Sequence, residues 1–226
     1  MPMKKIISGI LFLFLTLSCD VVPIEKYLEL AAELENQGRY EEAIEFHNKA
    51  LKKDPEFRPS LINRGADKAA LKDFEGAIED YKTILEFDSD NALALINVAN
   101  NYERLNQYKK AIKYYTIALE KGNISRHVKI VFNTTFDNDS QYLVDEADII
   151  FQRGLNYILD KQYENAKIDL EKCIELEYLV GDSYFYLGEI CRKQNDKENA
   201  CKNYKISAEI GISNAKEQMK NYCDNK

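Results

Sequence analysis

The sequence lacks most of the residues from which catalytic and metal sites are built. Its 226 residues include no tryptophan, four prolines, nine glycines and only two histidines, His47 and His127. Two distant histidines without a Cys/His spacing do not form a zinc site, and we expect His47 to be a packed side chain. The sequence also has no phosphate-binding glycine loop and no Gly-x-Ser-x-Gly motif. We therefore expect no enzymatic activity, no cofactor and no bound metal.

Basic residues are fewer than acidic ones, 31 against 38, which gives a formal net charge of −7. An acidic chain is a poor partner for nucleic acid and for anionic lipid headgroups. Hydrophobic residues make up 45% and charged residues 31% of the chain, as in soluble helical proteins. We expect the partners to be proteins and not nucleic acids.

A repeat runs through the chain with a period of about 34 residues, a length typical of stacked structural units. Ala43, Ala77 and Ala111 follow one another at this spacing, and Ala166 and Ala200 repeat it. Arrays of such units expose a binding surface and seldom carry out chemistry. A second column of small residues would let neighbouring helices approach closely; it comprises Ala31, Gly65, Ala99, Gly154 and Gly188.

The segment NQGRYEEAIEFHNKALKKDP at residues 36–55 resembles the second helix and closing proline of the tetratricopeptide repeat family. The resemblance implies an all-α fold, a right-handed superhelix of stacked antiparallel helix pairs. The sequence departs from the family at Arg64 and Arg153, which stand where the first helix of a unit has an apolar residue. The expected divisions are three units at 24–125, an insert at 126–146, two units at 147–214, and a capping helix and tail at 215–226.

The insert is inferred from the spacing between the third and fourth units. The interval from Ala111 to Ala166 exceeds one period by the length of the segment 126–146. Alternating apolar residues favour a small hairpin, although a loop packed along the array and a degraded helix fit as well. Long inserts are often functional, so this one is either a binding element or a spacer between two blocks of units.

The N-terminal residues have the pattern of an export signal. Lys4 and Lys5 precede an apolar run at 6–17 that is short for a membrane span. With Cys19 they are similar to a bacterial lipoprotein signal, in which the cysteine receives a diacylglycerol and becomes the new N-terminus. The alternatives are an ordinary signal peptide and a retained anchor. The implied parts are a signal peptide at 1–18 and a lipidated tether at 19–23.

A lipid on Cys19 would hold the protein at a membrane of the bacterial cell envelope, facing the periplasm or the exterior. Loss of residues 1–18 would leave 29 basic and 38 acidic side chains and a net charge of −9. The lipid, and not the charge of the protein, would then provide membrane attachment.

Four further cysteines all lie in the last third of the chain. An extracytoplasmic location permits disulfides. Cys191 and Cys201 flank the expected turn of the last helix pair, and Cys223 on the capping helix is a second feasible partner for Cys201. The sequence does not choose between the pairings. The alternative is that cysteines stay free, above all Cys173 and Cys191, which occupy interior columns where a free thiol behaves as a small apolar group.

The resemblance also implies a concave groove lined by the first helix of each unit, in which asparagines hold the backbone of an extended peptide. Asparagine suits this role because it both donates and accepts hydrogen bonds. The alternative is that these residues pack against the insert or a neighbouring helix. The expected polar contacts are Asn63, Asn97, Asn100 and Gln152, the apolar contacts are Ile62, Ile96, Phe151 and Phe185, and Tyr186 and Arg192 add polar contacts near the C-terminus.

These observations favour a non-enzymatic, membrane-tethered scaffold that binds an extended segment or a helix of another protein. Such a scaffold would belong to a cell-envelope assembly or secretion complex. The alternative is an accessory subunit of an enzyme that acts on polysaccharide or peptidoglycan.

Overall fold

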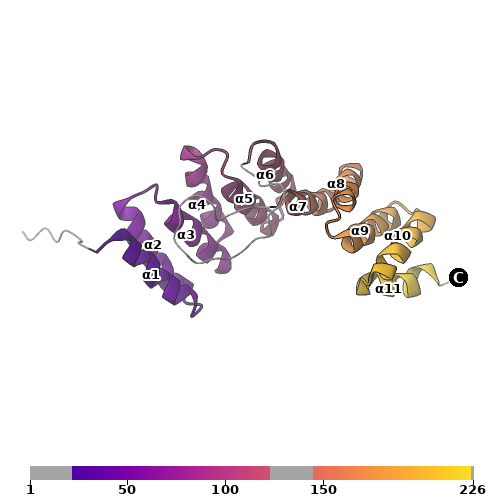
Figure 1. Cartoon of the computed structure of the whole chain (residues 1–226), viewed down its shortest axis with the longest axis horizontal. Helices are drawn as coiled ribbons and strands as arrows, with labels where there is room; N and C mark the ends of the chain where they lie inside the picture. The colour runs from indigo at the N-terminus through magenta and orange to yellow at the C-terminus, as the bar shows by residue number, and fades with distance from the viewer. Residues whose placement is uncertain (1–21, 123–144, 225–226) are drawn as a thin grey trace, which may run out of the picture.

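The computed structural model describes residues 22–122 and 145–224. These residues form a row of helix pairs with α1 at one end and α11 at the other (Figure 1). The first three pairs are α1 (Ile24–Glu35) with α2 (Tyr40–Lys53), α3 (Arg58–Ala70) with α4 (Phe74–Phe87), and α5 (Ala92–Arg104) with α6 (Tyr108–Lys121). The last two pairs are α7 (Glu146–Leu159) with α8 (Tyr163–Glu175), and α9 (Val180–Lys193) with α10 (Lys197–Ile210). The expected all-α array of helix pairs is confirmed.

Each helix packs mainly against the helices that precede and follow it in the chain. This pattern is expected for an array, in which every unit buries its apolar surface against its neighbours. None of the helices within the two described ranges is long and apolar enough to span a membrane.

The two helices of each pair are joined by a short turn that contains one residue with left-handed backbone. The φ angles of these residues lie between 56° and 72°. Asparagine and glycine adopt this conformation readily, whereas lysine does so at a cost. The turn is therefore imposed by packing of the pair and not by residue type alone. The residues are Gly38, Lys72, Asn106, Lys161 and Asn195.

The alanine column lies at the centre of each helix pair, and all five alanines are fully buried. The column of small residues leaves space for side chains of the paired helix as well as for its backbone. A Cβ atom on Gly65 would lie 2.8 Å from the Tyr81 ring, and one on Gly188 would lie 2.6 Å from the Tyr204 ring. These glycines therefore make room for an aromatic ring of the paired helix as well as for its backbone.

Buried apolar residues form two clusters that meet between α6 and α7. The first cluster extends from α2 to α6 and includes Ile149 of α7, and the second extends from α7 to α9. Leu119 of α6 packs against both clusters. The array is thus continuous across the expected insert, although residues 122–145 separate α6 from α7 in the sequence.

Parts of the expected organisation lie outside the described residues. These parts are the signal peptide at 1–18, Cys19 and nearly all of the insert at 126–146. Only the end of the insert is described, where the Asp145 side chain accepts a hydrogen bond from the backbone N–H of Ala147 and caps α7.

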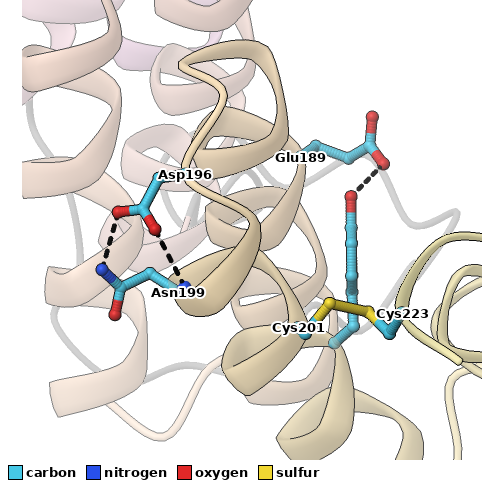
Figure 2. The surroundings of a disulfide bond; sticks show 6 residues. Glu189, Asp196, Asn199, Cys201 and Cys223 are labelled. Carbon is cyan, nitrogen blue, oxygen red and sulfur yellow. Dashed lines mark hydrogen bonds between the residues drawn. A yellow bond between two sulfur atoms is a disulfide. The ribbon is translucent and has the colours of Figure 1, made fainter. Parts of the chain in front are cut away.

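The C-terminal segment covers the last helix pair. Helix α11 (Ser213–Gln218) and the π-helical turn η1 (Met219–Cys223) pack on α10. Helix α11 begins two residues before the expected start of the capping helix at residue 215. Figure 2 shows the disulfide between Cys201 of α10 and Cys223 of η1. Of the two pairings that the sequence left open, the structure forms this one. Cys173 and Cys191 are free thiols, the first buried and the second half-buried.

The two arginines that depart from the family pattern form ion pairs with buried aspartates. Arg64 donates to both carboxylate oxygens of Asp80 at 2.6 and 2.9 Å. Arg153 binds Asp169 in the same way at 2.7 and 2.9 Å. In both units the arginine lies on the first helix and a buried aspartate lies on the second. The two polar substitutions within a unit therefore compensate each other.

Candidate functional site

An open pocket lies between the second and third helix pairs, with a volume of about 430 Å³. Helix α3 contributes small side chains, α4 contributes two aromatic rings, and α5 contributes three amides and a guanidinium. The lining residues are Ala66, Ala69, Ala70, Lys72, Phe74, Tyr81, Asn97, Asn100, Asn101 and Arg104.

The pocket exists because α3 carries alanines on the face opposite the asparagines of α5. Ala66 and Ala70 are exposed, and Ala69 is half-buried. A larger side chain at these positions would fill the space between the two helices. The result is an open hollow with alanines on one side and hydrogen-bonding side chains on the other.

The three asparagines of the pocket differ in their hydrogen bonds. Asn101 is buried, and its amide nitrogen donates to the backbone oxygen of Asn97 at 2.7 Å. The side-chain oxygen of Asn100 accepts a hydrogen bond from the Tyr115 hydroxyl. Asn101 is thus structural, whereas the amide nitrogen of Asn100 and the side chain of Asn97 form no hydrogen bond with the described residues.

Two cations give the pocket positive charge. Lys72 is exposed in the turn between α3 and α4, and Arg104 is exposed at the end of α5. No acidic side chain among the described residues forms an ion pair with either of them. An acidic group on a bound peptide would therefore meet uncompensated positive charge.

The structure brings only part of the predicted groove together. Asn97 and Asn100 line the same pocket, whereas Asn63 and Gln152 are half-buried outside it. The predicted apolar contacts are less accessible than expected. Ile62 and Ile96 are 9% exposed and Phe151 is 6% exposed, and all three belong to the core clusters. For these three residues the packing alternative describes the structure.

The predicted C-terminal residues lie in a separate cluster of aromatic rings. The Phe185 ring is 5.3 Å from the Tyr186 ring, which in turn is 6.0 Å from the Phe151 ring. Arg192 forms an ion pair with Glu189 at 2.7 Å. Glu189 also accepts a hydrogen bond from the Tyr204 hydroxyl. Part of the charge of Arg192 is thus compensated within the protein.

A second group of polar side chains converges between the first two helix pairs. Glu35, His47 and Asp67 each place one ligand-type atom within 4.8 Å of the other two. His47 and Asp67 are buried, and Glu35 is half-buried. Burial, together with the charge of Glu35, raises the pKa of Asp67 to about 7. His47 is packed as expected, but the convergence with two carboxylates was not predicted.

Several residues of both sites were not predicted from the sequence, for identifiable reasons. Ala66, Ala69 and Ala70 are unremarkable on a helix, and only the facing helix reveals the space they leave. Arg104 has no motif around it. Glu35 and Asp67 lie in different units, so that no short spacing connects them with His47.

Comparisons with known proteins identify the repeats. Models of the tetratricopeptide repeat match residues 24–57, 94–126 and 147–178, which confirms the first, third and fourth of the predicted repeats. No curated protein matches the sequence.

Solved structures show the same fold at low sequence identity. MamA superposes with a TM-score of 0.68 at 19% identity, covering 88% of this chain and 94% of MamA. YrrB, a TPR protein with an unusual peptide-binding site, gives 0.66 at 18%, covering 88% of this chain and 92% of YrrB. PilW, a widely conserved type IV pilus biogenesis factor, gives 0.59 at 16%, covering 90% of this chain and 95% of PilW. This chain therefore contains tetratricopeptide repeats, stacked as in these structures.

Proposed function

We propose that this protein is a non-enzymatic scaffold that binds an extended segment of a partner protein in the pocket between α3, α4 and α5. The observation that carries the proposal is the placement of Asn97 and Asn100 in one open pocket opposite three alanines. Side-chain amides at this place can hydrogen-bond the backbone of an extended peptide without requiring a particular sequence.

The charge of the pocket specifies the partner further. Lys72 and Arg104 both line it. A peptide with an acidic side chain or a terminal carboxylate would place its charge near these two cations, and arginine can bind a carboxylate with two hydrogen bonds. We therefore expect an acidic or C-terminal segment in preference to a basic one.

Two of the structurally similar proteins support a role of this kind. YrrB has a peptide-binding site, and PilW takes part in the biogenesis of type IV pili. The similarity is one of fold, and the role of this chain as a scaffold in a cell-envelope assembly or secretion complex is a proposal that rests on the pocket and the N-terminal sequence.

We also propose that a lipid on Cys19 holds the scaffold at a membrane. The sequence before Cys19 has two lysines and an apolar run, as in lipoprotein signals. Helix α1 begins at Ile24, five residues after Cys19. The first repeat would then lie close to the membrane surface.

The pocket is tested by placing a photoreactive side chain at Asn100 and irradiating intact cells. We expect a discrete cross-linked protein, with the cross-link in an extended segment identified by mass spectrometry. The matched control carries the same group at Ile168 of α8, which is 64% exposed and lies outside the pocket. Identical products from both positions would contradict the proposal.

The asparagines are tested with a peptide that contains the cross-linked segment. Two lost hydrogen bonds of ~1 kcal/mol each should weaken binding by roughly 30-fold in the Asn97→Ala/Asn100→Ala variant. Circular dichroism of the variant verifies folding, because Asn100 also contacts Tyr115. Unchanged affinity in the folded variant would exclude the proposed role of the amides.

The anchor is tested separately with Cys19→Ser. The variant should leave the membrane fraction, because acyl chains contribute ~0.8 kcal/mol for each buried methylene and the protein has no other proposed anchor. A variant that stays in the membrane fraction after a salt wash would refute lipidation as the means of attachment.

A further inference from the structure

Three side chains from consecutive helices converge at the junction of the first two helix pairs. Glu35 is the last residue of α1, His47 lies on α2, and Asp67 lies on α3. The Nε2 atom of His47 is 2.9 Å from Oε1 of Glu35 and 3.7 Å from Oδ2 of Asp67. One imidazole nitrogen thus faces two carboxylate oxygens.

The second nitrogen of the imidazole faces a hydroxyl. Nδ1 of His47 lies 3.4 Å from Oγ of Ser60, a fully buried residue. Without a metal, Nε2–H of His47 can donate to Glu35; a metal ion on Nε2 would displace this proton, and Nδ1–H would then donate to Ser60. Metal-binding histidines are commonly held in this way, by a hydrogen bond from the nitrogen that does not bind the metal.

One of the carboxylate oxygens has no hydrogen-bond donor. Oδ2 of Asp67 is buried and has no hydrogen-bond partner among the described residues. A buried carboxylate oxygen without a donor is unfavourable. Because this oxygen is directed at Nε2 of His47, a positive charge between the two would satisfy both groups.

We propose that Glu35, His47 and Asp67 bind a divalent transition-metal ion, with Zn²⁺ as the representative cation. Zinc binds imidazole nitrogen and carboxylate oxygen at about 2.0–2.2 Å, which places tetrahedral ligand atoms about 3.4 Å apart. The separations of 2.9 and 3.7 Å bracket this value. The partly exposed side chain of Glu35 provides the path of entry, and a water molecule would complete the coordination.

An equivalent junction elsewhere in the array shows what the site would look like without a metal. Glu103, Tyr115 and Asn156 hold the same positions between the third and fourth pairs. There the amide nitrogen of Asn156 donates to Oε2 of Glu103 at 2.7 Å. Asp67 stands where Asn156 stands, and in its ionised form, the form that binds a metal ion, its carboxylate cannot donate to Glu35. The first junction has therefore exchanged a hydrogen-bond donor for a metal-type ligand.

This equivalence supplies variants that the fold already accommodates. Asp67→Asn and His47→Tyr each introduce the residue found at the junction between the third and fourth pairs, and each removes one proposed metal ligand. His127→Ala is the matched control, because it removes the other histidine of the chain.

The test uses the full chain in detergent, stripped of metal and titrated calorimetrically with Zn²⁺ alone. We expect one saturable site, a rise in Tm on saturation, and loss of the Nε2 proton of His47 in ¹⁵N NMR spectra of His127→Ala. Asp67→Asn and His47→Tyr should weaken binding by more than about 100-fold, beyond the 10–100-fold effect of losing a supporting contact. Mg²⁺ should not compete, because it avoids nitrogen ligands.

Three results would overturn the proposal. They are the absence of a saturable Zn²⁺ site in the unmodified chain, Zn²⁺ binding that survives unchanged in His47→Tyr, and binding of Mg²⁺ with the same affinity. The last two would indicate weak binding to surface carboxylates.

Discussion

Arg153 shows how a single polar residue is accommodated within an apolar repeat position. The same position holds Val98 in the third unit, and the position of its partner Asp169 holds Tyr114. Arg153 contacts both oxygens of Asp169, which is nearly buried, and also contacts the Thr116 hydroxyl. Relative to the third unit, both residues of the pair have therefore changed together, and each provides the charge partner of the other.

We predict that Arg153→Ala destabilises the protein by about 3 kcal/mol, because it leaves the Asp169 carboxylate buried without its partner. The double variant Arg153→Val/Asp169→Tyr, which copies the third unit, should recover most of this loss. Urea unfolding followed by circular dichroism measures both. A single variant as stable as the unmodified protein would show that the ion pair contributes little.

The positions of both arginines within their helices are predictable from the sequence, where the two residues are departures from the repeat. The compensating signal is present in the sequence, as an arginine followed sixteen residues later by an aspartate in the second and fourth units. It is convincing only when the structure shows that these two positions face each other across a helix pair.

At the scale of elements, the helix pairs follow from local pattern, whereas the attachment of α11 depends on a covalent bond. Helix α11 spans only six residues, and helices this short are unstable alone. Its buried Ala215, the contact between the Tyr204 and Tyr222 rings, and the disulfide between Cys201 and Cys223 hold this segment on α10.

We predict that Cys223→Ser releases this segment, because the disulfide closes a loop that is worth about 3 kcal/mol in chain entropy. Hydrogen exchange should increase in α11, in η1 and on the face of α10 that this segment covers. Helices α1 to α6 should be unaffected, since they lie toward the other end of the array (Figure 1). Cys191→Ser is the control, and an equal effect of both variants would argue against a specific role of the disulfide.

The turns within the helix pairs illustrate a limit of local prediction. Gly38, Asn106 and Asn195 are residues that favour a left-handed backbone, and they mark turns in the sequence. Lys72 and Lys161 adopt the same conformation without such a preference. At these two turns the packing of the helix pair overrides residue type, and only the register of the repeat indicates the turn.

At the scale of the whole molecule, the protein is a linear array with two apolar clusters that meet at α6 and α7. Stability in such an array is approximately the sum of the units and of the interfaces between neighbours. The links between the other helix pairs are four residues long, at 54–57, 88–91 and 176–179. The connection between α6 and α7 is longer, but α7 packs directly on α6, so the stacking of the helix pairs continues across it.

We predict that Leu170→Ala destabilises the C-terminal part of the array in preference to the N-terminal part. Leu170 is fully buried in the second cluster, and truncation of a buried leucine costs about 2–5 kcal/mol. Hydrogen exchange should rise in α7 to α10 and remain slow in α1 to α4. Leu95→Ala in the first cluster should give the converse pattern. Uniform exchange in both variants would indicate a single cooperative unit instead.

The sequence by itself determined the repeat, the helix pairs and the central alanine column. Each of these follows from a pattern that recurs once in every unit and involves residues close together in the chain. Only the tertiary structure decided which cysteine pairs with Cys201, which asparagines share a pocket, and that Glu35, His47 and Asp67 meet. These features depend on distances between side chains of different helices, and small differences in packing alter such distances without changing the repeat pattern.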